Sequence, residues 1–150
     1  MAIRTAHQPT VFTYLDDGIR QAEGVEPGRN AVEFVLPGTE EMTARIKIYV
    51  TGGENKMHSH PREDHSFFIL GGKATFHLES DDNAIDLAAN QAIMLPRGTR
   101  YWFTNTGDGN LVMLRTGSGK DASVRLDSEG REMPTSDHAG WRHIEGIPAV

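Results

Sequence analysis

Residues 52–72 read GGENKMHSHPREDHSFFILGG, and three of the chain's seven histidines lie in this stretch, at His58, His60 and His65. Residues two apart in a β-strand point to the same face of a sheet, so a strand across His58 and His60 places both imidazoles on one side. Pro61 ends that strand because it cannot donate a ladder hydrogen bond, and His65 begins the next strand. The stretch therefore predicts three imidazoles that converge on one point.

A second interpretation of this cluster is three ordinary histidines on a loop, solvated or hydrogen-bonded to the backbone. We favour a metal site, because packing needs alone rarely bring three histidines together at such spacings. The other histidines have no comparable neighbours and are predicted to be ordinary surface or core residues: His7, His77, His138 and His143.

Residues 43–50, TARIKIYV, alternate between apolar and polar side chains with a period of two, which is typical of a half-buried strand. The apolar face carries Ala44, Ile46, Ile48 and Val50. We expect the opposite face, with Arg45, Lys47 and Tyr49, to contact solvent. The alternative is that this face lines the interior, where the two cations would contact an anionic substrate.

Further short strands bounded by Gly, Pro, Asn or Asp are predicted at residues 32–36, 65–70, 73–78, 91–95, 101–105 and 111–116. Short strands with tight turns favour an all-β sandwich or barrel. Residues 12–22 are the one place besides the extreme C-terminus with room for a helical turn.

A length of 150 residues is typical of one domain. We expect a single domain over residues 1–150, with its core at about 32–116. Residues 117–140 are rich in Gly, Ser and charged residues and cannot fold alone, so 117–150 is predicted to be an extended C-terminal arm. Its last apolar residues, Trp141, Ile144 and Ile147, would dock on the barrel or on a second subunit.

The stretch at 52–72 resembles the first motif of the cupin superfamily, which is Gly, five residues, His-x-His, three or four residues, Glu, six residues and Gly. The matching positions are Gly52, His58, His60 and Gly72. The longer spacing puts His65 at the glutamate position, whereas the shorter spacing would put Asp64 there. We prefer His65, because FFILGG then matches the aromatic and aliphatic stretch of the family.

Residues 90–105, NQAIMLPRGTRYWFTN, follow the spacing of the second cupin motif: Gly, five residues, Pro-x-Gly, two residues, His, three residues and Asn. Asn90 replaces the glycine, a mild change because Asn also tolerates left-handed backbone. Tyr101 replaces a metal-binding histidine. Tyr101 has three possible roles: it would bind the metal as a phenolate, protonate a reaction intermediate, or only pack in the interior. We favour the second role.

The resemblance implies a jelly-roll barrel of six to eight strands around a divalent metal ion. The usual cupin site has three histidines and one carboxylate. With His65 in the carboxylate's place, the neutral imidazoles of His58, His60 and His65 would leave the ion near its full charge, which favours an anionic or chelating substrate. Fe(II) suits such an open nitrogen face best, with Zn, Ni, Mn or Cu as alternatives. Glu63 or Asp64 would hydrogen-bond a ligating histidine or serve the turn alone.

We therefore expect a metal-dependent enzyme for a small oxygenated organic molecule, foremost an Fe(II)-type dioxygenase. The alternatives are a redox-neutral isomerase, cyclase or lyase in which Tyr101 moves a proton, and a small-molecule-binding cupin without catalysis. Because protons compete with the metal for imidazoles, metal affinity is expected to weaken as the pH falls through about 6.5.

The amino-acid composition excludes several classes of binding partner. Lys and Arg number 15 against 21 Asp and Glu, a net charge of -6, so there is no basic field for nucleic acid. Apolar runs are far shorter than the ~20 residues that span a bilayer, and no signal peptide is recognisable. The absence of cysteine excludes disulfides and thiolate ligands and favours a reducing compartment. We expect a cytoplasmic protein, and exposed sheet edges with a long arm favour a homodimer.

Overall fold

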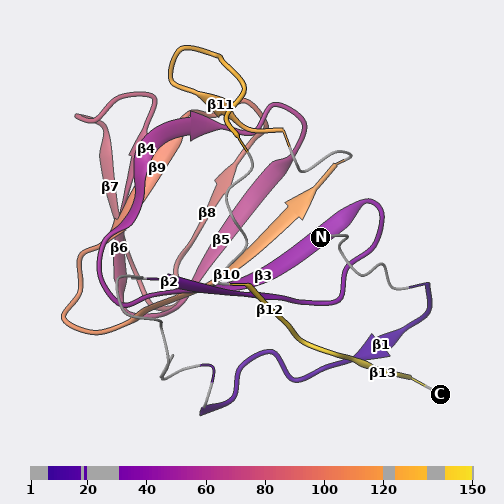
Figure 1. Cartoon of the computed structure of the whole chain (residues 1–150). Helices are drawn as coiled ribbons and strands as arrows, with labels where there is room; N and C mark the ends of the chain where they lie inside the picture. Colours follow the sequence, from indigo (N-terminus) through magenta and orange to yellow (C-terminus); the bar gives the residue numbers. More distant parts are fainter. Residues whose placement is uncertain (1–6, 18, 20–30, 120–123, 135–140, 150) are drawn as a thin grey trace.

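The computed structural model describes residues 7–17, 19, 31–119, 124–134 and 141–149, and within these ranges the regular secondary structure is almost entirely β-strand, joined by turns and loops (Figure 1). The strands are β1 (Thr10–Val11), β2 (Ala31–Val35), β3 (Met42–Tyr49), β4 (Gly53–Ser59), β5 (Asp64–Gly71), β6 (Lys73–Leu78), β7 (Ala84–Ala88), β8 (Ala92–Leu95), β9 (Tyr101–Asn105), β10 (Leu111–Ser118), β11 (Leu126–Asp127), β12 (Trp141–His143) and β13 (Ile147–Pro148). The predicted all-β class is confirmed.

Two sheets form the walls of a barrel, as Figure 1 shows. One has six strands in the order β12-β2-β3-β10-β5-β8, and the other has five in the order β11-β4-β9-β6-β7. Consecutive strands alternate between the sheets at several points, which is the jelly-roll connection that the resemblance to cupins implies. A separate pair, β1 and β13, joins the two ends of the described chain.

Aromatic side chains fill the space between the two sheets. The rings of Phe67 and Phe76 lie 5.3 Å apart, those of Phe76 and Phe103 lie 5.1 Å apart, and all three side chains are fully buried. Ring contacts of this kind favour close, offset or edge-to-face packing. The strand register places His58 and His65 beyond these rings along the same sheets, and the end of the barrel with these two histidines is called its polar end below.

The prediction of a solvent-facing polar side on β3 is wrong. Arg45 is 9% exposed and Lys47 only 2%, and both point to the barrel interior with Tyr49. The opposite face of β3 is also buried, because Ile46 and Ile48 pack in a second hydrophobic cluster with side chains from outside the barrel, such as Ile19, Leu15 and Ile144. A period of two cannot reveal which face of a strand is inside when both faces are covered.

The C-terminal arm is attached to the barrel by strand pairing where the structure describes it. β12 runs parallel to β2, with Trp141 opposite Glu33, and β11 pairs with β4. The sequence predicted docking of the arm on the barrel or on a second subunit, and the backbone pairing of β12 with β2 agrees with the first of these, but the arm's strands were not predicted. They are two or three residues long, too short for periodicity to be recognised. β10 also continues to Ser118, past the expected end of the core.

The predicted helical turn at 12–22 lies partly outside the described residues, but Asp17 and Ile19 are helical and the Asp16 carboxylate accepts a hydrogen bond from the Ile19 backbone N–H. Such a contact is a typical N-terminal cap. In the part of the chain that is described, no helix has the length and apolar character needed to cross a membrane.

Two asparagines of the second motif have clear structural tasks. Asn90 adopts a positive φ of 70°, as its replacement of glycine predicted. The Asn105 side-chain amide donates to the backbone carbonyls of Tyr49 and Gly109, and its oxygen accepts from the Gly107 N–H. Asn105 thereby holds two neighbouring loops at the end of β9.

Candidate metal centre

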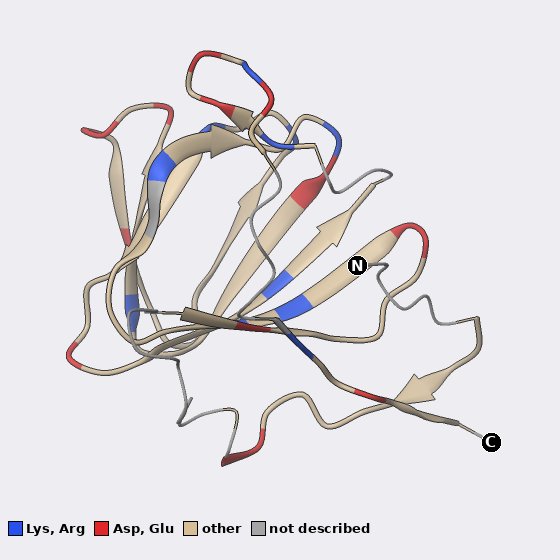
Figure 2. Cartoon of the chain, viewed as in Figure 1, with Lys and Arg blue, Asp and Glu red and all other residues tan. Residues whose placement is uncertain are grey.

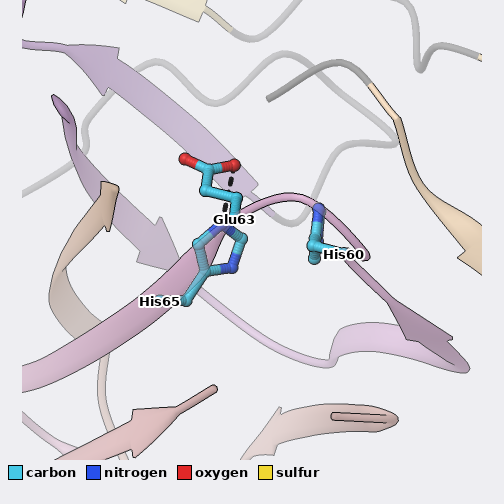
Figure 3. Close-up of side chains that lie close together, drawn as sticks. All are labelled: His60, Glu63 and His65. Atoms are coloured by element: carbon cyan, nitrogen blue, oxygen red, sulfur yellow. Dashed lines mark ion pairs between the residues drawn. The ribbon is translucent and has the colours of Figure 1, made fainter. Parts of the chain in front are cut away.

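The first histidine cluster folds into the polar end of the barrel. His60 directly follows β4, Glu63 lies in the turn before β5, and His65 is on β5 (Figure 3). One ligand atom from each of these three side chains lies within 4.8 Å of the others. This is the one group of three or more metal-binding side chains found in the described residues.

The contact between Glu63 and His65 has the spacing of two metal ligands. The distance from Glu63 Oε2 to His65 Nε2 is 2.9 Å, and two adjacent ligands at about 2.1 Å from one ion are about 3 Å apart. Both atoms are buried, and within the described structure neither makes a hydrogen bond of good angular geometry. Buried polar atoms of this kind call for an explanation, and a shared cation supplies one.

Glu63 is held in place from three sides. Thr43 Oγ1 donates a hydrogen bond of 2.9 Å to Oε1, and Arg115 Nη2 lies 3.9 Å from the same oxygen. Gly117 lies against the carboxylate so closely that a Cβ atom at this position would overlap Glu63 Oε1. Burial alone would raise the pKa of Glu63, but His65 and the charge of Arg115 outweigh it and lower that pKa. Glu63 is therefore an ionised carboxylate.

His65 is a neutral imidazole with contacts at both nitrogens. Burial and the charge of Arg115 lower its pKa to about 4, although Glu63 opposes this shift. Its Nδ1 lies 3.4 Å from the Tyr101 hydroxyl, and its Nε2 faces Glu63. Proton competition at His65 therefore sets in at a lower pH than the ordinary histidine value predicts.

His58 lies beside this group. Its Nδ1 is 2.9 Å from the carbonyl oxygen of Lys56, and because a carbonyl only accepts, Nδ1 carries the proton. The buried Nε2 is then the nitrogen with a lone pair, the usual arrangement of a metal-binding histidine. The ring centroid of His58 is 5.2 Å from that of His60 and 4.5 Å from that of Tyr101. The structure thus brings the three predicted histidines and Tyr101 together.

Asp64 is engaged elsewhere. Its carboxylate accepts hydrogen bonds of 2.8 Å from both the backbone N–H and Nη2 of Arg97, and these bonds lower its pKa to about 2. Since Asp64 and His65 are neighbours on a strand, they point in opposite directions. Of the two alignments that the motif spacing left open, the structure favours the one with His65 inside.

The sequence predicted Glu63 or Asp64 as a hydrogen-bond partner of a ligating histidine, but it did not predict Glu63 as a member of the ligand group. The expectation of a cluster without a carboxylate is corrected by its position, 2% exposed and against His65. Motif spacing did not indicate it, because Glu63 follows His60 too closely for the family pattern. Residues two apart in extended chain point to the same side, which is why His58 and His60 were expected to share a face. The same rule, applied to Glu63 and His65, would have predicted that these two side chains share a face as well.

A second set of charged side chains lines the interior next to this cluster. Lys47 Nζ lies 3.1 Å from Glu33 Oε1, and Arg45 Nη1 lies 3.4 Å from Glu33 Oε2. Arg115 is 6% exposed and lies between this group and Glu63. Figure 2 shows the blue of basic residues on the adjacent strands β3 and β10.

Acid is expected to destabilise the metal-free protein through His65. Its pKa is about 4 in the folded protein against 6.5 for an ordinary histidine, so between these values the unfolded chain binds a proton that the folded chain does not. The free energy of unfolding should therefore fall from pH 6.5 toward pH 4, by up to about 1.4 kcal/mol per pH unit. Urea unfolding at several pH values measures the slope. A His65→Asn variant, which lacks this titration, should have a shallower slope, and equal slopes would contradict the assignment.

Comparison with known proteins agrees with this architecture. A family profile described as the cupin domain matches residues 45–116. Acireductone dioxygenase of Synechococcus sp. (strain CC9311) is 29% identical over 93 residues, which are 59% of this chain and 46% of that protein. The chain thus spans about half the length of this curated relative.

Solved structures show the same fold at low sequence identity. A double-stranded β-helix protein of Klebsiella pneumoniae has a TM-score of 0.62 and 16% identity, with 74% of this chain and 88% of that chain covered. KdgF from Halomonas sp. has a TM-score of 0.56 and 18% identity, with 66% and 86% covered. An oxalate decarboxylase of Bacillus subtilis, studied for its Mn(II) centres, has a TM-score of 0.51 and 18% identity, with 59% and 24% covered.

Proposed function

The chain belongs to the cupin superfamily, and from this premise we propose that it is a metal-dependent enzyme acting on a small oxygenated organic molecule, with dioxygen insertion as its reaction. The observation that carries the proposal is the buried group of His60, Glu63 and His65 at the polar end of the barrel. The similarity to acireductone dioxygenase supports the reaction class.

The donor set fits a divalent metal ion. Two imidazoles and one carboxylate are the ligands of many non-haem Fe(II) oxygenases. We assign His60, Glu63 and His65 as ligands. We assign His58 as a further nitrogen donor, since its Nε2 is buried and its ring centroid lies 5.2 Å from that of His60. These four side chains restore the three histidines and one carboxylate of the usual cupin site. Iron remains the favoured metal, with Zn, Ni, Mn or Cu as alternatives.

The surrounding residues prepare the site for chemistry on a small molecule. A bound divalent ion would act as a Lewis acid, and in the ferrous state it would also supply electrons to dioxygen. Thr43 orients Glu63 through its hydroxyl, and Lys56 orients His58 through its carbonyl. Tyr101, 2% exposed, is placed to hold or donate a proton through its hydroxyl.

Metal analysis followed by oxygen uptake tests the proposal. Protein purified without added metal should contain close to one equivalent of a transition metal, and iron-loaded protein should consume oxygen with one member of a panel of diketones, enols and catechols. Protein that holds stoichiometric iron and consumes no oxygen across the panel would exclude the dioxygenase.

A redox-neutral isomerase, cyclase or lyase is the second candidate, favoured by the 3.4 Å approach of the Tyr101 hydroxyl to His65 Nδ1. A buried hydroxyl next to a ligand is suited to moving a substrate proton. Under this alternative, zinc-loaded protein turns over substrate without oxygen. Tyr101→Phe would then slow exchange of the substrate's C–H hydrogen with D2O while leaving the metal content unchanged.

A further inference from the structure

Three basic side chains lie buried on two neighbouring strands inside the barrel. Arg45 and Lys47 are on β3, and Arg115 is on β10 directly opposite Arg45 in the strand register. Their exposed fractions are 9%, 2% and 6%. Like charges that face each other across a strand pair are destabilising, and burial increases the cost. An arrangement with this cost calls for a compensating negative charge.

Among the described residues, the carboxylates of Glu33 and Glu63 lie within ion-pair distance of these three cations. Glu33 contacts both Arg45 and Lys47. The nearest carboxylate oxygen to Arg115 is Glu63 Oε1 at 3.9 Å, which is too long for a hydrogen bond. In the part of the chain that is described, the buried Arg115 Nε has no hydrogen-bond partner. Arg115 therefore presents a buried guanidinium whose Nε–H makes no hydrogen bond to the described residues.

The charges of the described residues point to an anion. The inner wall carries Arg45, Lys47 and Arg115 against Glu33 and Glu63, a formal excess of one positive charge. A metal ion on Glu63 would add two more positive charges. The repulsion is also seen in Arg45, whose pKa is lowered to about 10 by burial and by the charge of Arg115.

We propose that Arg115 binds a carboxylate group of the substrate next to the metal centre. The inference rests on the proposed function for the metal, but the carboxylate contact itself is made by this chain. A guanidinium offers two parallel N–H donors that match the two oxygens of a carboxylate. Because Arg115 lies 3.9 Å from a proposed metal ligand, the substrate's carboxylate is close to the oxygens that chelate the ion.

Malonate binding to the metal-free protein tests the inference. Isothermal titration at constant ionic strength should show malonate binding to the wild type and at least tenfold weaker binding to Arg115→Met. Arg115→Lys should lie between them, because lysine keeps the charge and loses the paired donors. Arg100→Met is the matched control, since Arg100 forms an exposed ion pair with Glu79 and should leave malonate binding unchanged.

Thermal unfolding and zinc titration separate the alternatives. Without malonate, Arg115→Met should have a Tm close to that of the wild type, because it removes both a repulsion with Arg45 and an attraction to Glu63, and it should still bind zinc. The inference would be overturned by any of three results: no malonate binding by the wild type, equal malonate binding by Arg115→Met and wild type, or a large drop in the Tm of Arg115→Met. Malonate binding that depends on Arg115 in a protein that binds no zinc would sustain the carboxylate contact and refute the metal centre.

Discussion

Glu63→Gln is expected to lower the affinity for divalent metal more than 100-fold, as much as His60→Ala does. The substitution keeps the size of the side chain and removes the charge of an ionised carboxylate that lies 2.9 Å from His65 Nε2. If Glu63 only oriented His65 through a hydrogen bond, the loss would be about tenfold, at the low end for partners that do not touch the metal. Competition titrations with Zn²⁺ and Mn²⁺ against a chelating indicator measure the difference.

Asp64 supplies the matched control for this experiment. It is the neighbouring carboxylate, but it is bound to Arg97 at the surface and is not part of the metal-binding group. Asp64→Asn should leave metal affinity within about twofold of wild type. A larger loss from Asp64→Asn than from Glu63→Gln would reverse our choice between the two carboxylates, and thermal unfolding of both variants verifies that they are folded.

Gly117→Ala is expected to disturb the same site from the opposite strand. The added methyl group would occupy the position of Glu63 Oε1 and approach the Thr43 hydroxyl. Forcing an extra carbon into a packed interior costs about 1–3 kcal/mol. The backbone of Gly117 is not in the left-handed region, so the cost comes from this contact alone. We expect lower stability and a loss of metal affinity close to that of Glu63→Gln.

A double-mutant cycle identifies the cause. In the Glu63→Ala background the carboxylate is absent, so Gly117→Ala should cost much less in free energy of unfolding than it does in the wild type. Gly109→Ala is the control, because a Cβ at that position would meet no atom within 4 Å. Urea unfolding of the four proteins of the cycle gives the coupling energy, and additive costs would show that Gly117 does not act through Glu63.

The local patterns that were recognised are those that depend on neighbours in sequence. His58 and His60 share a face because they are two residues apart, and Pro61 and the turn bring His65 back on the next strand. Tyr101 follows from the second motif and lies opposite His58 in the strand register. Most strands of the barrel were predictable because each is several residues long and bounded by turn residues, but β7 was not predicted.

The elements that were missed depend on contacts between distant segments. Alternation along β3 identified two faces, but the covering of its outer face by Ile19 and Ile144 decided that Arg45 and Lys47 are inside. The short strands β11, β12 and β13 exist because the arm pairs with β4, β2 and β1, which no local pattern of two or three residues reveals.

The sequence by itself determined the all-β class and the convergence of three imidazoles, since both follow from side-chain alternation and turn residues, and its resemblance to the cupin motifs implied the jelly-roll connection of the strands. Only the tertiary structure decided that Glu63, and not Asp64, lies within the group of possible metal ligands. Glu63 is there because Gly117, far along the chain on β10, leaves room for it and Thr43 on β3 hydrogen-bonds it. Space and hydrogen-bond partners from other strands are properties of the folded chain.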